Sequence, residues 1–248
     1  MTVARRRQLL FAALYFSEGA PIGFLWWALP TRLRAAGVEV ADIAALLAAL
    51  ALPWAFKFLG APLIDIVRTP RWTLRAWVAA CQLLMGLCLV PVLLLDWSTG
   101  FTTIATLLML HAVAAAAQDV AVDAYALAIV APHERAAINA AMQGGMLTGR
   151  AVFGGGALLL DARIGANATI ALLIGAIWAS LAVLLIAGER EPARTVTTFT
   201  ARRRQFQSAL GEVARRRTTW LVLGFAAIGG AGFEAVGLLS AHTCSIVA

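Results

Sequence analysis

Long apolar runs separated by short arginine-rich segments dominate the hydropathy pattern of the chain. A membrane-spanning helix needs about 20 mostly apolar residues, and six such runs precede the one long polar stretch. These runs cover residues 8–30, 41–64, 74–95, 101–130, 136–160 and 167–187. A polar stretch follows at 188–218, and a further apolar run begins at residue 219. The pattern predicts an all-α membrane protein with six transmembrane helices and the start of a seventh.

The composition agrees with a protein embedded in a membrane. Hydrophobic residues make up 61% of the chain and charged residues 13%, whereas an ordinary soluble domain has about 25% charged residues. Too little polar surface remains to cover a water-soluble globule, which excludes the soluble enzyme classes. Cys81, Cys88 and Cys244 have neither metal-ligand nor disulfide-framework spacing. We therefore expect no metal site and no cofactor.

The net charge of +7 comes from arginines that cluster between the apolar runs. If the N-terminus lies inside, the cytoplasmic segments hold fifteen arginines and the opposite loops hold three, namely Arg32, Arg34 and Arg163. This asymmetry predicts a cytoplasmic N-terminus. It also accounts for the basic charge without a nucleic-acid partner, so no nucleic-acid binding is expected.

The polar stretch at 188–218 contains two groups of three arginines around a short apolar stripe. The stripe consists of Phe206, Leu210 and Val213, which are spaced as on one face of a helix. Such a segment is typical of a basic amphipathic helix that lies on anionic lipid. We expect membrane lipid to be its partner.

Charged side chains inside a bilayer cost several kcal/mol each and are functional candidates by default. The predicted spans contain Glu18, Lys57, Asp119, Asp123 and Arg150. If the spans are grouped as 1–3 and 4–6, the first helix of each group contains acidic residues, the second contains a basic residue and the third contains no charged residue. The ends of the second and fifth spans, residues 60–65 and 156–161, are also similar. Both observations predict two inverted three-helix repeats.

Asp119 and Asp123 are four residues apart, so both carboxylates lie on one face of their helix. Two neighbouring carboxylates in a poorly hydrated site do not both ionise at low cost, so one is expected to hold and exchange a proton. Lys57 or Arg150 is expected to pair with these acids between helices, and depth along the spans favours Asp123 as the partner of Lys57. An intramembrane aspartyl protease would need carboxylates facing each other across a gap. We therefore predict no enzymatic activity.

Helix-breaking and small residues mark two spans. Gly145 and Gly149 form a GxxxG pattern, which predicts close packing against a neighbouring helix. Residues 18–21 combine a carboxylate with glycine and proline, which favours a discontinuous helix beside a substrate site. Trp26 lies near the outer end of the first span and is expected either to anchor the interface or to line the cavity.

Four sequence blocks resemble the AmpG-like branch of the major facilitator superfamily. They read YFSEGAP at 15–21, LPWAFKFLGAPLID at 52–65, QDVAVDA at 118–124 and APHER at 131–135. This branch includes muropeptide permeases, siderophore-uptake permeases and acetyl-CoA transporters, and the second block looks closest to the bacterial muropeptide and siderophore importers. The resemblance implies a proton-driven, alternating-access importer with twelve spans in the bacterial inner membrane. An acetyl-CoA-type transporter is the alternative within the family.

The intramembrane charges and the resembling blocks together select the candidate residues. The proton-coupling candidates are Asp119, Asp123 and Glu18; the charge-pair and cavity candidates are Lys57, Arg150, Gln118, Tyr15 and Trp26; the candidates for a gate between the second and third spans are Asp65 and Arg68. The expected partners are protons and a small-molecule solute.

The expected organisation is a six-span half at 1–187, a basic cytoplasmic loop at 188–218 and an incomplete seventh span at 219–248. The second half that the resemblance implies is absent from this sequence. We therefore expect a truncated transporter, a half-transporter that pairs with a C-terminal half or with a second copy, or a membrane remnant that does not transport.

Overall fold

The computed structural model describes residues 2–57, 60, 62, 64, 67–69, 72–97, 99–192, 204, 207–208, 211–222 and 224–225. The chain divides into two compact units, Met1–Thr195 and Val196–Ala248. Several predictions fall at least partly outside the described residues, including parts of the second span and of the 188–218 loop, the gate residue Asp65, the stripe residues Phe206 and Leu210, and the seventh span beyond residue 225. In the second unit, residues 211–215 and 217–222 are helical.

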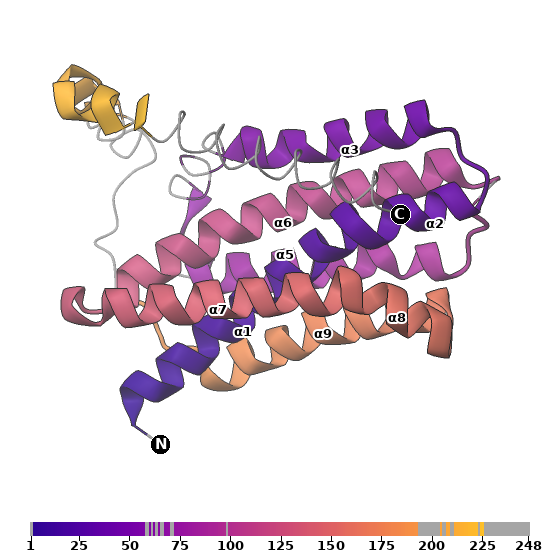
Figure 1. Ribbon diagram of the computed structural model, residues 1–248. Helices are drawn as coiled ribbons and strands as arrows, with labels where there is room; N and C mark the ends of the chain where they lie inside the picture. Colours follow the sequence, from indigo (N-terminus) through magenta and orange to yellow (C-terminus); the bar gives the residue numbers. More distant parts are fainter. Residues whose placement is uncertain are drawn as a thin grey trace. The chain divides into compact units, whose positions relative to one another are not determined.

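The first unit is helical, and its described residues include no strand (Figure 1). Its elements are α1 (Val3–Gly23), η1 (Phe24–Ala28), α2 (Leu29–Ala35), α3 (Val40–Ala55), α5 (Leu74–Leu89), η2 (Pro91–Leu93), α6 (Phe101–Ile129), η3 (Pro132–Glu134), α7 (Arg135–Phe153), α8 (Gly155–Ile164) and α9 (Ala166–Ala187). Each of the six predicted spans falls on one or more of these helices.

Four helical segments in the described residues are long and apolar enough to cross a membrane. They are Val3–Ala35, Leu74–Leu93, Phe101–Ile129 and Ala166–Ala187. The second predicted span corresponds to α3, a shorter apolar helix of 16 residues. The chain is therefore a multi-pass membrane protein.

Two predicted helix shapes differ from the structure. The fifth predicted span, 136–160, is not continuous, because α7 ends and α8 begins at Gly154, whose φ of −89° and ψ of −101° leave the helical region. The predicted discontinuity at residues 18–21 is wrong, since α1 continues through Pro21. The helix widens one turn later into the π-helical segment η1, where Phe24 N–H donates to the carbonyls of Ala20 and Pro21.

Helix α1 lies against α6, α7 and α9, and it packs most extensively against α7 (Figure 1). The predicted close approach at the GxxxG pattern is confirmed. A Cβ atom at Gly149 would lie 2.7 Å from the backbone nitrogen of Ala20, and one at Gly145 would overlap the carbonyl of Ala12. Only glycine permits this backbone contact, and the contact fixes the position of the α1 side chains that build the site.

Candidate functional site

A lysine–aspartate pair joins the segment just after α3 to the middle of α6. Lys57 Nζ donates to Asp119 Oδ2 at 2.6 Å. The Asp119 side chain is 7% exposed, whereas that of Lys57 is 46% exposed. The predicted contact between Lys57 and an aspartate of the fourth span is therefore present. The expectation that Asp123 is the preferred partner is wrong, because the ammonium reaches the aspartate that lies one turn deeper.

Asp123 has a different partner, which explains this arrangement. The hydroxyl of Tyr15, on α1, donates a hydrogen bond to Asp123 Oδ1. Tyr15 is buried, and Asp123 lies at the exposed surface of α6. One aspartate is thus held by a neutral hydroxyl and the other by a cation, although both lie on one helix face.

Glu18 is buried on α1 beside these pairs, with 2% of its surface exposed. The Glu18 carboxyl lies within electrostatic reach of four other ionisable side chains: Asp119, Lys57, Asp123 and Arg150. Glu18 Oε2 and Arg150 Nε are buried without a hydrogen-bond partner in the described part of the chain. The structure therefore gathers the five predicted intramembrane charges into one neighbourhood, which we call the central charge cluster, with one more acid than base.

A second polar group, which contains no charge, connects four helices behind this cluster. Gln118 is fully buried and donates to Ser17 Oγ at 3.2 Å and to the Leu14 carbonyl at 3.3 Å. Gln82, on α5, donates to Ser17 Oγ at 2.9 Å and to Ser180 Oγ, on α9, at 3.0 Å. The predicted cavity residue Gln118 thus belongs to a buried connection between α1, α5, α6 and α9.

Gln82, Ser17 and Ser180 were not predicted, because the cost of burial in the bilayer was weighed only for charged side chains. A signal was available: uncharged polar side chains inside apolar helices also need hydrogen-bond partners in a bilayer. Three such residues on three different spans predict an interhelical network, although the sequence does not specify the pairs.

The remaining predicted residues lie away from the cluster or outside the described part. Trp26, on η1, is half-buried and packs against the hydrophobic core. The gate candidate Arg68 forms an ion pair with Glu191, which follows α9. Its predicted companion Asp65 is not among the described residues.

Arginine–carboxylate pairs join the helix ends on both sides of the bundle. On the side of the N-terminus, Arg7 donates to Glu134 at 2.6 Å and, through two nitrogens, to Glu189 at 2.9 and 2.8 Å. These hydrogen bonds hold the pKa of the Glu189 carboxyl below its ordinary value. On the other side, Arg32 binds both oxygens of Asp161 and lies 4.8 Å from the centre of the Phe24 ring.

These features limit the chemistry of the site. No three His, Cys, Asp or Glu side chains are placed to hold a metal ion together among the described residues. The central charge cluster contains acids that differ in exposure and partner, beside a lysine that reaches the surface. Such a set is suited to binding and releasing a proton or to holding a polar solute.

Comparisons with known proteins find distant similarity to a permease and to uncharacterized proteins. No family model matches the chain. It is 25% identical to the anhydromuropeptide permease of Escherichia coli K12 over 219 residues, which is 88% of this chain and 44% of that permease. It is also 32% identical over 130 residues to an uncharacterized protein of Haemophilus influenzae, covering 52% of this chain and 30% of that protein. An uncharacterized protein of Schizosaccharomyces pombe is 27% identical over 157 residues, covering 60% of this chain and 30% of that protein.

The chain thus spans less than half the length of the curated relatives that it matches. Its four long apolar helices characterise it as a multi-pass membrane protein, and it has distant similarity to a permease over most of its length.

Proposed function

We propose that the chain forms one half of a proton-coupled solute transporter of the AmpG-like branch of the major facilitator superfamily. The observation that carries the proposal is the hydrogen-bonded pair of Lys57 and Asp119 beside the buried Glu18. Ionisable residues within membrane spans mark proton relays and substrate paths, because a structural role alone would not justify their cost. The solute class is that of the muropeptide and siderophore permeases, which the resembling sequence blocks favour.

The proposed mechanism uses the competition for Asp119 between Lys57 and a proton. When Asp119 is ionised, Lys57 holds it and α3 stays against α6. When Asp119 is protonated, the attraction is lost and Lys57 is free to face the solute or Glu18. A carboxylate that changes partner in this way couples proton binding to helix movement, which is the differential contact that a two-state transporter needs.

The proposed transport unit contains a second helical bundle that faces the central charge cluster. Lys57 and Asp123 are exposed although both lie within predicted spans, and charges at that depth need a polar neighbour or a water-filled cavity, which fits a surface that another bundle covers. The second bundle is supplied by a C-terminal half or by a second copy of the chain. We further propose six spans in two inverted triplets, in the bacterial inner membrane, with the arginine-rich loops inside.

The transport proposal is tested with membrane vesicles from cells that produce the chain. Uptake of a radiolabelled anhydromuropeptide is measured with an imposed inward proton gradient, and again after a protonophore has removed the gradient. We expect accumulation that the protonophore abolishes, and none in vesicles from matched cells without the chain. Uptake that is unaffected by the protonophore would contradict proton coupling, and equal uptake in both vesicle types would contradict transport of this solute.

A further inference from the structure

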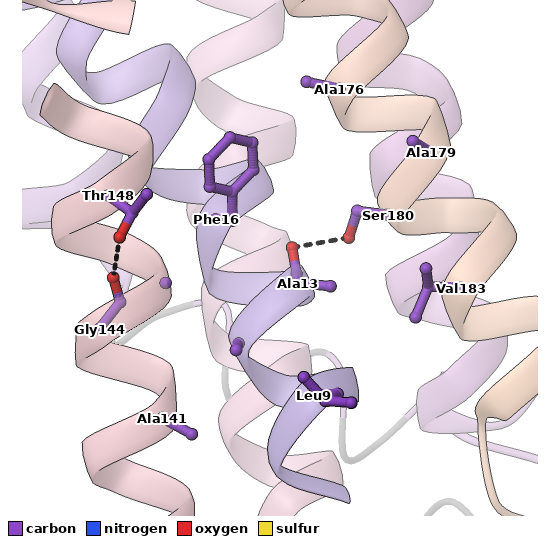
Figure 2. A pocket seen from close by; sticks show the side chains of 12 residues that line it. Leu9, Ala13, Phe16, Ala141, Gly144, Thr148, Ala176, Ala179, Ser180 and Val183 are labelled. Carbon is purple, nitrogen blue, oxygen red and sulfur yellow. Dashed lines mark hydrogen bonds between the residues drawn. The ribbon is translucent and has the colours of Figure 1, made fainter. Parts of the chain in front are cut away.

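An open groove of about 660 Å³ lies across α1 from the central charge cluster. Helices α7 and α9 form its walls and α1 forms its floor (Figure 2). Floor residues Leu9, Ala12 and Phe16 lie on the α1 face opposite Glu18, because a two-residue step turns a helix by about 200°. The groove is therefore separate from the proposed transport site.

The groove presents an apolar surface to its occupant. Its two hydroxyl groups already have acceptors: Thr148 donates to the Gly144 carbonyl at 2.7 Å, and Ser180 donates to the Ala13 carbonyl at 2.9 Å (Figure 2). The other lining side chains are small or apolar. An occupant needs no hydrogen-bonding group along this length, which fits a hydrocarbon chain.

The surroundings of the groove are typical of a lipid-facing surface. Leu147, on α7, is 62% exposed, and Leu172, on α9, is 48% exposed. Exposed large apolar side chains beside a groove in a multi-pass membrane protein are suited to contact with the acyl chains of the bilayer.

One end of the groove carries positive charge. Arg5 lies four residues before Leu9, so it extends the same α1 face beyond the groove. Arg6 bridges α1 to the last turn of α9, where its Nη2 donates to the Ile186 carbonyl at 3.2 Å. Both arginines are exposed, and neither has a carboxylate within ion-pair distance among the described residues, although the charge of Arg6 acts on Glu189. Arg7 differs, since two glutamates bind it.

We propose that this groove binds one acyl chain of an anionic phospholipid whose phosphate lies at Arg5 and Arg6. Basic groups between transmembrane helices on the arginine-rich side are suited to anionic headgroups. The apolar groove and the adjacent positive end match the two parts of such a lipid. This proposal does not depend on the transport proposal.

The test uses the full chain in nanodiscs of phosphatidylcholine that contain a minority of phosphatidylglycerol with a photoreactive acyl chain. After irradiation, mass spectrometry of peptides locates the label. We expect label concentrated on residues 9–16 of α1 and 141–148 of α7. Uniform label over lipid-facing helices would overturn the proposal, because it would show bulk lipid contact only. Chain-to-chain cross-links through the groove would also overturn it, because the occupant would then be a second copy.

Two matched pairs of variants sharpen this test. Gly144→Leu fills the groove, where an added Cβ has no neighbour within 4 Å, and we expect it to remove most of the groove label. Gly175→Leu is the control: it has the same free space but lies outside the groove lining, and we expect label as in the unaltered chain. Equal label in both variants would contradict the acyl-chain site.

The headgroup contact is tested by comparing photoreactive phosphatidylglycerol with photoreactive phosphatidylcholine. We expect Arg5→Gln to lower the preference for phosphatidylglycerol by about five-fold, the contribution of one basic residue near a membrane surface. Arg34→Gln, which removes an exposed arginine at the end of α2, should leave the preference unchanged. An unchanged preference in Arg5→Gln would overturn the assignment of the phosphate to this end.

Discussion

The middle of the bundle and its two ends use different cations to bind carboxylates. At the ends, Arg32 and Arg7 each bind both oxygens of an aspartate or glutamate. In the middle, Lys57 makes one hydrogen bond to Asp119. An arginine fork is pre-organised and always charged, whereas a lysine ammonium is a mobile point charge on a flexible stem. The ends are therefore built to hold helices together, and the middle is built to change partners.

The largest expected effect comes from breaking an end pair. Asp161→Ala leaves the buried Arg32 without its carboxylate, which we expect to lower the free energy of unfolding by about 3 kcal/mol. Arg32→Lys keeps the charge but loses the two-pronged contact, at a cost of about 2 kcal/mol. Unfolding is followed with a thiol-reactive dye, since Cys81 and Cys88 are free and buried, in a Cys244→Ser background. An unchanged stability in both variants would show that the pair does not hold the helices.

The next effect concerns the contact that fixes α1, the helix that contributes to both regions. Gly149→Ala places a Cβ within 2.7 Å of the Ala20 nitrogen, which we expect to cost about 1–3 kcal/mol of stability. Gly144→Ala is the matched control, because its Cβ meets nothing within 4 Å and alanine favours the helix by up to about 1 kcal/mol. The same thiol-dye unfolding assay measures both. Equal stabilities would contradict the close packing of α1 on α7.

A smaller change converts the central pair into the type found at the ends. Lys57→Arg offers Asp119 a permanent two-pronged partner, which favours the paired state. A bias of about 1.4 kcal/mol toward one state is enough to lower proton-driven uptake about ten-fold. Uptake is measured in the vesicle assay, with Arg32→Lys as the reverse exchange that should retain most activity. Full uptake by Lys57→Arg would remove the functional distinction between the two regions.

The smallest effect is the pH dependence of the Arg7 pair. Arg7 lowers the pKa of Glu189 below its ordinary value of 4.5. A carboxyl with a lowered pKa in the folded state stabilises the fold above pH 4.5, and this contribution disappears as the pH falls through the lowered pKa. We expect Glu189→Gln to show a weaker fall of stability below pH 4.5 than the unaltered chain in thermal unfolding across a pH series. Identical pH profiles would show that the pair contributes nothing.

The membrane character and the gathering of charges could be predicted from the sequence for physical reasons. Apolar runs of about 20 residues leave few alternatives to a membrane helix, and the cost of an isolated charge in a bilayer requires that charges find one another. Periodicity placed Asp119 and Asp123 on one face, and GxxxG indicated close packing against a neighbouring helix, which the structure identifies as α1. These arguments depend on local spacing, which a sequence displays directly.

The exact pairs could not be predicted, because they depend on side-chain reach and on the relative depth of different helices. The depth of a residue in the membrane, estimated by counting residues along its own span, is accurate only to about one turn, or 5.4 Å. Asp119 and Asp123 are separated by about this distance. The hydroxyl of Tyr15 decides between them, and no spacing rule reveals its direction. Arg7 and Arg32 were interpreted only as signals of orientation, so their pairs with Glu189 and Asp161 were missed.

The most direct test of the proton-coupling claim separates accumulation from exchange in Asp119→Asn, which mimics the protonated carboxyl. We predict that this variant no longer accumulates solute against a gradient but still exchanges labelled for unlabelled solute across the vesicle membrane. The control is Asp42→Asn, which neutralises an exposed acid in the first turn of α3. This variant should both accumulate solute and exchange it. Accumulation by Asp119→Asn that remains fully sensitive to the proton gradient would contradict the assignment and make Glu18 the next acid to test.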